Sequence, residues 1–190
     1  MSEIDDAADA LRDGDLVVYP TETVYGLGAD ALDPEAVARA YEVKGRDRGK
    51  PVSLAVPDVE AALSYTAPTA RERRFMHEFL PGPVTAVVER RGTVPDVLTA
   101  GRDRVGVRVP DHEVALELLA EFAPITSTSA NESATGSVRE PDELGERIRS
   151  AASVLLDGGR TPGTESTVVD VEAGEIVRRG AMANEIEDWL

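Results

Sequence analysis

The sequence contains no cysteine and only two histidines among 190 residues. Disulfide bonds, thiolate metal ligands and cysteine nucleophiles are therefore excluded, and a zinc centre is disfavoured. No apolar run approaches the length of a membrane span, and the N-terminal segment MSEIDDAADALRDG is acidic where a signal peptide is basic and then apolar. We therefore expect neither export nor membrane insertion, and the lack of cysteine fits a reducing, cytoplasmic setting.

Lysine is also nearly missing. The chain carries 20 Lys and Arg against 36 Asp and Glu, a formal net charge of -16, and its only lysines are Lys44 and Lys50. General binding to nucleic acid is disfavoured, because affinity for phosphate backbones comes mainly from cationic contacts. Acid excess with lysine depletion is typical of a halophilic, acidic proteome. We therefore expect the folded fraction to depend on the KCl concentration.

Periodicity and capping residues predict alternating helices and strands. The pair Asp33 and Pro34 opens one helix, Thr69 another, and Asp111 is expected to cap a third. Helices are predicted over residues 4–11, 34–43, 69–80, 112–122, 142–152 and 184–190. Strands are predicted over residues 16–19, 53–56, 84–88, 105–109, 125–127 and 154–156, with a hairpin of 167–171 and 176–178.

This alternation indicates an α/β fold, and the late hairpin makes its sheet mixed rather than purely parallel. No linker divides the chain, and 190 residues suffice for one well-buried core, so we expect a single domain over residues 1–190. Polar loops at strand ends are then the expected place for a site.

Five segments combine small, hydroxyl and cationic residues: YPTETVYGLG, KGRDRGKP, LPGPVT, STSANES and DGGRTPGTEST. Each segment alone has a plain structural explanation, since glycine and proline mark turns and serine and threonine cap helices. Their joint occurrence in one chain favours a functional site instead.

The segment KGRDRGKP, residues 44–51, places four cations within seven residues directly after a helix. It is either a solvated basic turn paired with nearby acids or a clamp for phosphate and carboxylate groups. Arginine binds oxyanions through two parallel hydrogen bonds and lysine adds a compact charge, so the clamp is chemically suitable.

The segments STSANES and DGGRTPGTEST offer further donors. Ser127, Ser129 and Asn131 follow a strand and suit phosphate oxygens, ribose hydroxyls or a small polar substrate, although a capping loop is the alternative. The glycines at 158, 159 and 163 would let backbone amides approach an anion. Neither GxxxxGK[ST] nor GxGxxG occurs, which excludes ordinary P-loop and Rossmann sites. His77 and His112 lie outside any nucleophile elbow.

Taken in order, YPTETVYGLG, KGRDRGKP, PGPVT, VGVRVPDH, ITSTSANES, GTESTVVD and IVRRG resemble the YrdC/TsaC family of threonylcarbamoyl-AMP synthases, over residues 15–180. The resemblance implies a YrdC-like fold: a twisted, mostly mixed or antiparallel sheet flanked by helices, with a cationic concave cleft. It also implies a nucleotidyltransferase that condenses L-threonine, bicarbonate and ATP into threonylcarbamoyl-AMP and pyrophosphate. Magnesium would arrive with ATP, held largely by phosphates and water.

The resemblance also implies roles for individual residues. Lys44 and Arg46 are the catalytic KxR pair at the phosphates and carbamate. The expected threonine-binding residues are Thr21, Arg108, Ser127 and Ser166. Besides the KxR pair, the expected ATP-binding residues are Lys50, Thr99, Ser129, Asn131, Ser137 and Arg178. The product would pass to a tRNA threonylcarbamoyltransferase for modification of the adenosine beside the anticodon, and a contact with tRNA itself is a further expectation.

Two other interpretations stay open. One is an RNA-binding module without catalysis, which the charge of -16 disfavours. The other is a carbamoyl-transfer domain similar to that of hydrogenase maturation proteins, which would use carbamoyl phosphate. Those proteins are longer and carry cysteine-rich zinc modules, and this sequence has no cysteine.

Overall fold

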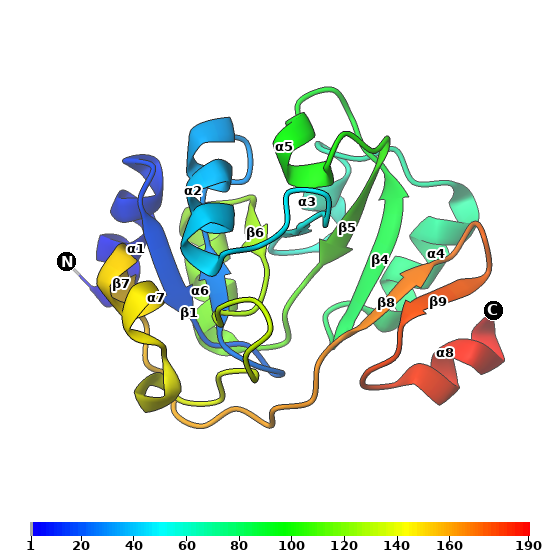
Figure 1. Ribbon diagram of the computed structural model, residues 1–190. Coiled ribbons are helices and arrows are strands. Elements are labelled where there is room, and N and C mark those ends of the chain that lie inside the picture. The colour runs from blue at the N-terminus through cyan, green and yellow to red at the C-terminus, as the bar shows by residue number, and fades with distance from the viewer. Residues whose placement is uncertain (1) are drawn as a thin grey trace.

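The computed structural model describes residues 2–190, which form nine β-strands in two sheets (Figure 1). The larger sheet has the strand order β6 (Ile125–Ser127), β3 (Ser53–Ala55), β5 (Arg104–Arg108), β4 (Val84–Glu89), β8 (Thr167–Asp170) and β9 (Glu175–Arg178). The smaller sheet has the order β2 (Gly26–Gly28), β1 (Leu16–Tyr19) and β7 (Ala152–Leu155).

Both sheets mix strand directions, as the sequence predicted. The pairs β1 with β7, β3 with β5 and β4 with β8 are parallel, and the remaining pairs are antiparallel. The expectation of one sheet is wrong, because the N-terminal strand pairs with β2 and β7 rather than with the central strands. The two sheets connect through isolated bridges from Gly26 to Ser129 and from Asp30 to Ile125.

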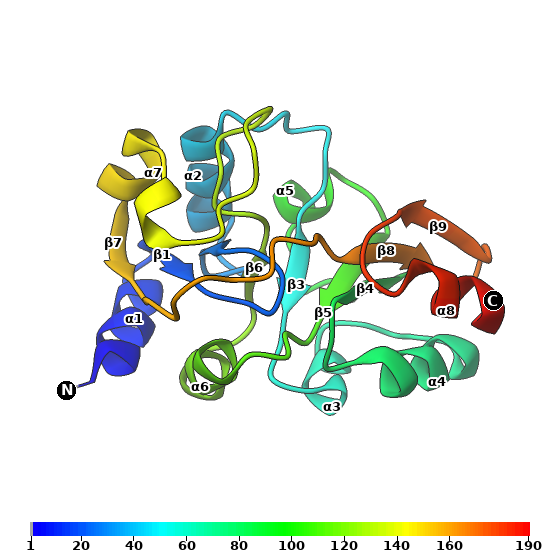
Figure 2. The same cartoon turned by 90° about the horizontal axis from the view of Figure 1, so that it is seen from below.

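Helices cover both sides of this arrangement. They are α1 (Glu3–Arg12), α2 (Pro34–Lys44), α3 (Val59–Ala62), α4 (Ala70–Phe79), α5 (Asp96–Thr99), α6 (Glu113–Glu121), α7 (Glu146–Ala151) and α8 (Ala183–Trp189). Figure 2 shows α3, α4 and α6 along one side of the molecule and α2, α5 and α7 along the other, with α7 beside the smaller sheet. None of the helices in residues 2–190 is long and apolar enough to cross a membrane.

The main core joins the larger sheet to α4 and α8. Valines of β4, β5 and β8 pack against Phe75, Met76 and Ile186, all of them fully buried. The Phe75 ring lies 4.7 Å from the Phe79 ring and 5.1 Å from the Trp189 ring, measured between centroids, in tilted and edge-on geometry. The C-terminal helix is thereby fixed against α4.

Most predicted elements and caps are confirmed. The Asp33 side chain accepts from the Glu35 amide at 2.9 Å, with proline in the first turn of α2. Thr69 and Glu72 form a capping box at the start of α4, and β8 and β9 form the expected antiparallel hairpin. Local rules sufficed here because the determining contacts lie within a few residues.

Two expectations about helices are wrong. His112, not Asp111, is the N-cap of α6, and no side chain makes a capping hydrogen bond there. The helix expected over residues 142–152 is split into a 3₁₀ turn (Pro141–Glu143) and the shorter α7. The break comes at Leu144 and Gly145, whose backbones are both extended.

The strand β2 and the short helices α3 and α5 were not predicted. Strand β2 consists of Gly-Leu-Gly, which carries no strand pattern. Glycine is required at position 26 for steric reasons, since a Cβ there would lie 2.8 Å from Cζ of the Tyr19 ring. The close approach of β2 to β1 brings the YPTETVYGLG segment beside the β6 loop.

Candidate active site

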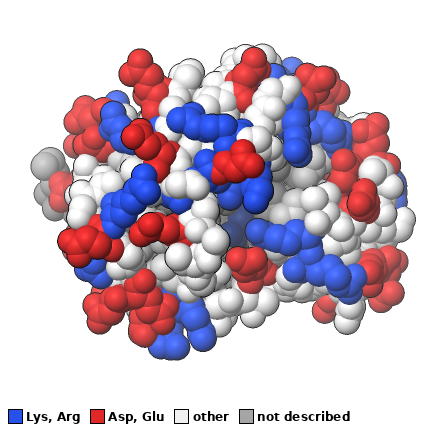
Figure 3. Space-filling model, viewed as in Figure 1, with Lys and Arg blue, Asp and Glu red and all other residues white. Residues whose placement is uncertain are grey.

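A cavity of about 510 Å³ lies where the motif segments meet the larger sheet. Its lining includes three carboxylates, from Asp103, Glu165 and Asp170, and five guanidinium groups, from Arg46, Arg102, Arg104, Arg108 and Arg178. Figure 3 shows basic side chains gathered around a hollow in the middle of this face. The lining is therefore positive on balance, although the chain as a whole carries a charge of -16.

Seven of the residues predicted for the site line this cavity: Thr21, Arg46, Arg108, Ser127, Ser129, Ser166 and Arg178. The side chains come from six segments that are distant in the sequence, and strand pairing of β5 with β4, of β4 with β8 and of β8 with β9 brings three of these segments together. The other five predicted residues are Lys44, Lys50, Thr99, Asn131 and Ser137, and they lie outside the lining.

The KxR pair is placed by the end of α2. Gly45 adopts a left-handed conformation with φ of 59°, which ends the helix and turns the chain. Arg46 then reaches the cavity and donates to the carbonyl groups of Lys50 at 3.2 Å and Pro51 at 2.9 Å. Its guanidinium is thereby fixed at the cavity wall.

Lys44, in contrast, does not line the cavity, and only 3% of its surface is exposed. Its ammonium donates to the carbonyl oxygens of Ser129 and of Asn131, the latter at 2.8 Å, and its own carbonyl accepts from the Ser133 amide at 2.8 Å. Burial, together with the nearby charge of Arg46, lowers the pKa of Lys44 to about 8. Lys44 therefore holds the STSANES loop in place, and any contact with a nucleotide stays a prediction.

This lowered pKa predicts a pH dependence. The folded chain loses the Lys44 proton near pH 8, whereas the ordinary value is 10.5. The unfolded chain then binds more protons, so this group raises the free energy of unfolding as pH increases from about 8 to 10.5. We expect an NMR titration of ¹³Cε-labelled lysine, which gives only two signals, to show a midpoint near 8 for Lys44. Lys50→Arg assigns the signals, and a midpoint at 10.5 would contradict the prediction.

Arg108 is the most enclosed cation of the cavity. Its Nη2 donates to Glu22 at 2.7 Å and to the Thr23 hydroxyl at 2.8 Å. The Thr21 hydroxyl lies farther away, at 3.5 Å. That hydroxyl already donates to the Val24 carbonyl at 2.6 Å and accepts from the amides of Thr23 and Val24, so its hydrogen bonds close the PTET turn.

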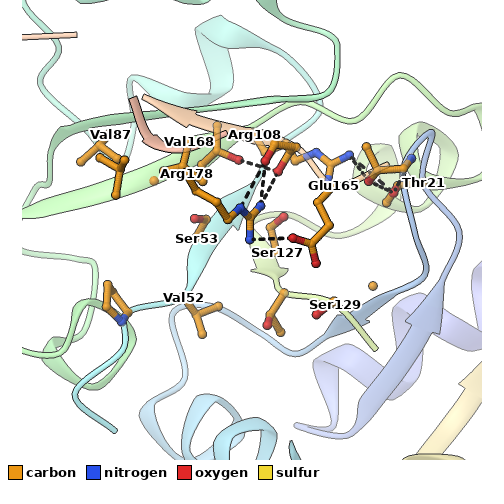
Figure 4. Close-up of a pocket in the computed structure, with 18 of the residues that line it drawn as sticks. Thr21, Val52, Ser53, Val87, Arg108, Ser127, Ser129, Glu165, Val168 and Arg178 are labelled. Carbon is orange, nitrogen blue, oxygen red and sulfur yellow. Dashed lines mark hydrogen bonds and ion pairs between the residues drawn. The ribbon is translucent and has the colours of Figure 1, made fainter. Parts of the chain in front are cut away.

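A second cluster surrounds Arg178. Its Nη2 donates to the carbonyl and the hydroxyl of Ser166, both at 2.9 Å, and Nη1 lies 3.8 Å from the Glu165 carboxylate. Glu165 also accepts from the Ser137 hydroxyl at 3.1 Å. Figure 4 shows the Arg178 and Glu165 side chains directed toward one another across the cavity. Burial lowers the pKa of Arg178, and the charges of Arg108 and Arg46 lower it further although Glu165 opposes them.

The three glycine amides of the DGGRTPGTEST segment are occupied by protein acceptors, contrary to the expectation that they would be available to an anion. The Gly158 amide donates to the Tyr25 hydroxyl at 3.0 Å, and the Gly159 amide to Asp157 at 2.8 Å. The Gly163 amide donates to the Thr23 carbonyl at 2.7 Å. Gly158 is required by crowding, since a Cβ would lie 2.6 Å from the Pro20 ring. These glycines hold the segment against the PTET loop.

The remaining predicted residues take structural positions. The Asn131 amide donates to the Glu132 and Thr135 carbonyls, while its buried Oδ1 has no partner among the described residues. Thr99 is fully buried and Lys50 is exposed. The nucleotide-binding roles of these residues stay predictions.

Sequence reasoning missed four residues that line the cavity, namely Ser53, Thr85, Arg104 and Glu165. It also missed Glu22, which accepts a hydrogen bond from Arg108. Glu22 and Glu165 stand inside motif segments, but their sequence positions do not reveal that they lie beside Arg108 and Arg178. Among residues 2–190, no group of three or more His, Asp or Glu side chains could hold a metal ion. The arrival of magnesium with ATP, held largely by phosphates and water, stays a prediction.

Comparisons with known proteins point to one family. The family model Sua5/YciO/YrdC, described as "Telomere recombination", matches residues 9–180. A threonylcarbamoyl-AMP synthase from Pyrococcus abyssi is 40% identical over 168 residues, which is 87% of this chain and 49% of that protein. A putative threonylcarbamoyl-AMP synthase from Methanocaldococcus jannaschii is 31% identical over 88% of this chain and 79% of its own length.

The fold comparison agrees. A crystal structure of P. abyssi Sua5 complexed with L-threonine superposes with a TM-score of 0.90 at 39% identity, covering 100% of this chain and 58% of that one. The fold expected from the sequence resemblance is thereby confirmed. The chain spans about half the length of the P. abyssi relative.

Proposed function

Because the chain belongs to the Sua5/YciO/YrdC family, we propose that it makes threonylcarbamoyl-AMP from L-threonine, bicarbonate and ATP and releases pyrophosphate. The relatives named threonylcarbamoyl-AMP synthase and the relative crystallised with L-threonine support this assignment. By this proposal the enzyme is a nucleotidyltransferase, since it transfers an adenylyl group to an oxygen of a carbamate.

The observation that carries the proposal is the convergence of Arg46, Arg108 and Arg178 on one cavity. The reaction gathers several anions, namely the threonine carboxylate, the carbamate and the phosphates of ATP. Three mutually repelling guanidinium groups, one of them with a lowered pKa, provide the matching positive charge before any ligand arrives.

In this proposal each step has a place in the cavity. Arg108 binds the threonine carboxylate, with the Ser127 and Ser166 hydroxyls beside it. Bicarbonate takes up a proton and loses water to give carbon dioxide. The neutral threonine amine forms a bond to the carbon of that carbon dioxide and releases a proton to solvent, which leaves a carbamate. A carbamate oxygen then attacks the α-phosphorus, and the bond to the pyrophosphate oxygen breaks. Arg46 and Arg178 stabilise the charge on the phosphates, and Ser129 donates to them.

Magnesium would enter with ATP and neutralise part of the phosphate charge. We assign it no protein ligand. The product is an activated carbamoyl group, so we further propose that it passes to a tRNA threonylcarbamoyltransferase in the cytoplasm. A direct contact with tRNA remains part of the proposal.

The decisive experiment measures pyrophosphate release from ATP with both L-threonine and bicarbonate, and with each omitted. We expect release only when both are present, because the carbamate that attacks ATP is made from them. Release that is independent of either substrate would overturn the synthase assignment. Mass spectrometry of the product provides the second readout.

The two alternative functions have their own outcomes in the same assay. A carbamoyl-transfer domain would consume ATP with carbamoyl phosphate in place of threonine and bicarbonate. An RNA-binding module would retain tRNA with a steep salt dependence and release no pyrophosphate. The charge of -16 disfavours the latter, although the cavity itself is lined by arginines.

A further inference from the structure

Glu22 is a carboxylate that no step of the proposed reaction uses. It lies in the PTET segment, and its side chain is 17% exposed, against 8% for its partner Arg108. Glu22 does not belong to the cavity lining, whereas Arg108 does. The carboxylate therefore contacts the guanidinium without itself bordering the ligand space.

The contacts of Glu22 fix it from two directions. Oε1 accepts from Nη2 of Arg108 at 2.7 Å, and Oε2 accepts from the Asp111 amide at 3.0 Å. Thr23 accepts from the same Nη2 at 2.8 Å. The PTET loop and the segment that follows β5 are thus joined through one carboxylate, and Nη2 of Arg108 is held by protein oxygens.

The remaining donors of Arg108 have no such partners. Its Nε is buried and donates to no partner among the described residues, and Nη1 makes no hydrogen bond there. A guanidinium held at one nitrogen and unsatisfied at the others is oriented for a further anion. Arginine side chains carry much rotamer freedom, so a fixed partner lowers the entropy cost of binding.

We propose that Glu22 is a positioning residue, which holds Arg108 so that its remaining donors face the carboxylate of the amino-acid substrate. This inference rests on the proposed function, since it takes the substrate to be L-threonine. It assigns to the PTET segment a task in amino-acid recognition in addition to any contact that its threonines make.

The opposite role would be a gate, in which Glu22 occupies the place of the substrate carboxylate and must leave. The geometry disfavours a gate, because the Asp111 amide anchors the second oxygen and Glu22 stands outside the cavity. The two roles predict opposite changes in the affinity for threonine. Loss of the Glu22 charge weakens threonine binding if it positions Arg108 and strengthens it if it competes.

The first test is steady-state kinetics of Glu22→Gln, measured by pyrophosphate release. We expect KM for L-threonine to rise by at least about tenfold, with kcat and KM for ATP changed by less than about threefold. Glu22→Asp keeps the charge but is too short to span Arg108 and the Asp111 amide, so we expect an intermediate KM. Glu113→Gln, an exposed residue near Asp111, is the matched control and should behave as wild type.

A second test separates positioning from general structural damage. If Glu22 acts through Arg108, then Glu22→Gln should raise KM for threonine by less than about threefold in an Arg108→Met background. A tenfold effect in that background, or an unchanged or lower KM in Glu22→Gln alone, overturns the inference. If instead wild-type protein releases no threonine-dependent pyrophosphate, the proposed function fails first and this inference falls with it.

Discussion

Replacing Arg46 with alanine is expected to slow threonylcarbamoyl-AMP formation by at least about tenfold at saturating substrates. Removing one preorganised charge donor from a transition state typically costs a few kcal/mol. Arg46 lines the cavity and is fixed by the carbonyls of Lys50 and Pro51, so it needs no reorganisation to meet developing charge. Initial rates of pyrophosphate release with L-threonine and bicarbonate present provide the measurement.

The matched control is Arg48→Ala. Arg48 comes from the same loop, is exposed, and packs over the Tyr41 ring at 5.3 Å from its centroid, outside the cavity lining. We expect near wild-type rates for this variant. Equal rates in Arg46→Ala and Arg48→Ala would show that loop charge, not the position of Arg46, is what the enzyme uses, and would refute the assigned centre.

Lys44→Ala should slow the reaction as well, but for a different reason. Lys44 holds the carbonyls of Ser129 and Asn131, so its loss loosens the loop that carries Ser129 to the cavity. By our proposal, Arg46 acts as a charge donor at the cavity, and Lys44 supports the loop through the Ser129 and Asn131 carbonyls. Lys44 and Arg46 are two residues apart in the sequence, but Arg46 lines the cavity and Lys44 is buried outside its lining.

The sequence predicted local structure where local contacts decide it. Asp33 and Thr69 cap their helices through amides two or three residues away, and such contacts leave a pattern in the sequence. Strand β2 has no such pattern, since its glycines are required by the close approach of the Tyr19 ring on the neighbouring strand β1. The burial of Lys44 was also beyond sequence reasoning, because lysine is ordinarily exposed and its carbonyl partners come from a distant loop.

In the site, too, some residues could be predicted from the sequence and others depend on contacts between distant segments. Family motifs indicated Arg108 and Ser166, and the pairing of β5, β4 and β8 explains why residues so far apart meet. The motifs did not indicate Glu22, since its importance depends on which face of Arg108 it touches. Likewise, the glycines of the DGG segment suggested an anion loop, but their amides are directed into hydrogen bonds with Tyr25, Asp157 and Thr23.

Arg104 also lines the cavity. We expect its replacement to lower the free energy of unfolding more than it lowers the reaction rate. Its Nη2 donates to Glu72 at 2.8 Å, Asp170 at 3.0 Å and the Val87 carbonyl at 2.7 Å, while Nη1 donates to Glu172 at 2.7 Å. Burial alone would lower the pKa of Arg104, but its bond to Glu72 and the neighbouring carboxylates raise it on balance. The guanidinium is therefore held firmly in its charged form.

Arg104→Ala would leave the Glu72 carboxylate, which is 1% exposed, without its cation. Breaking a buried ion pair by removing one partner costs about 3 kcal/mol, which lowers Tm by about 6–12 °C for a chain of this size. Urea unfolding at neutral pH measures the free energy directly. Arg102→Ala, an exposed lining residue two positions earlier, should unfold like wild type.

The double variant Arg104→Ala/Glu72→Gln identifies the cause. In the wild-type protein the Thr69 amide donates to the Glu72 carboxylate at 2.7 Å. Glutamine at position 72 keeps an oxygen that can accept this hydrogen bond but removes the buried charge. The double variant should therefore be more stable than Arg104→Ala by about 1–2 kcal/mol, because an unpaired buried charge costs more than an unpaired amide. If the double variant is no more stable than the single one, the cost arises from lost packing around β5, and the buried carboxylate is not the reason that Arg104 is needed.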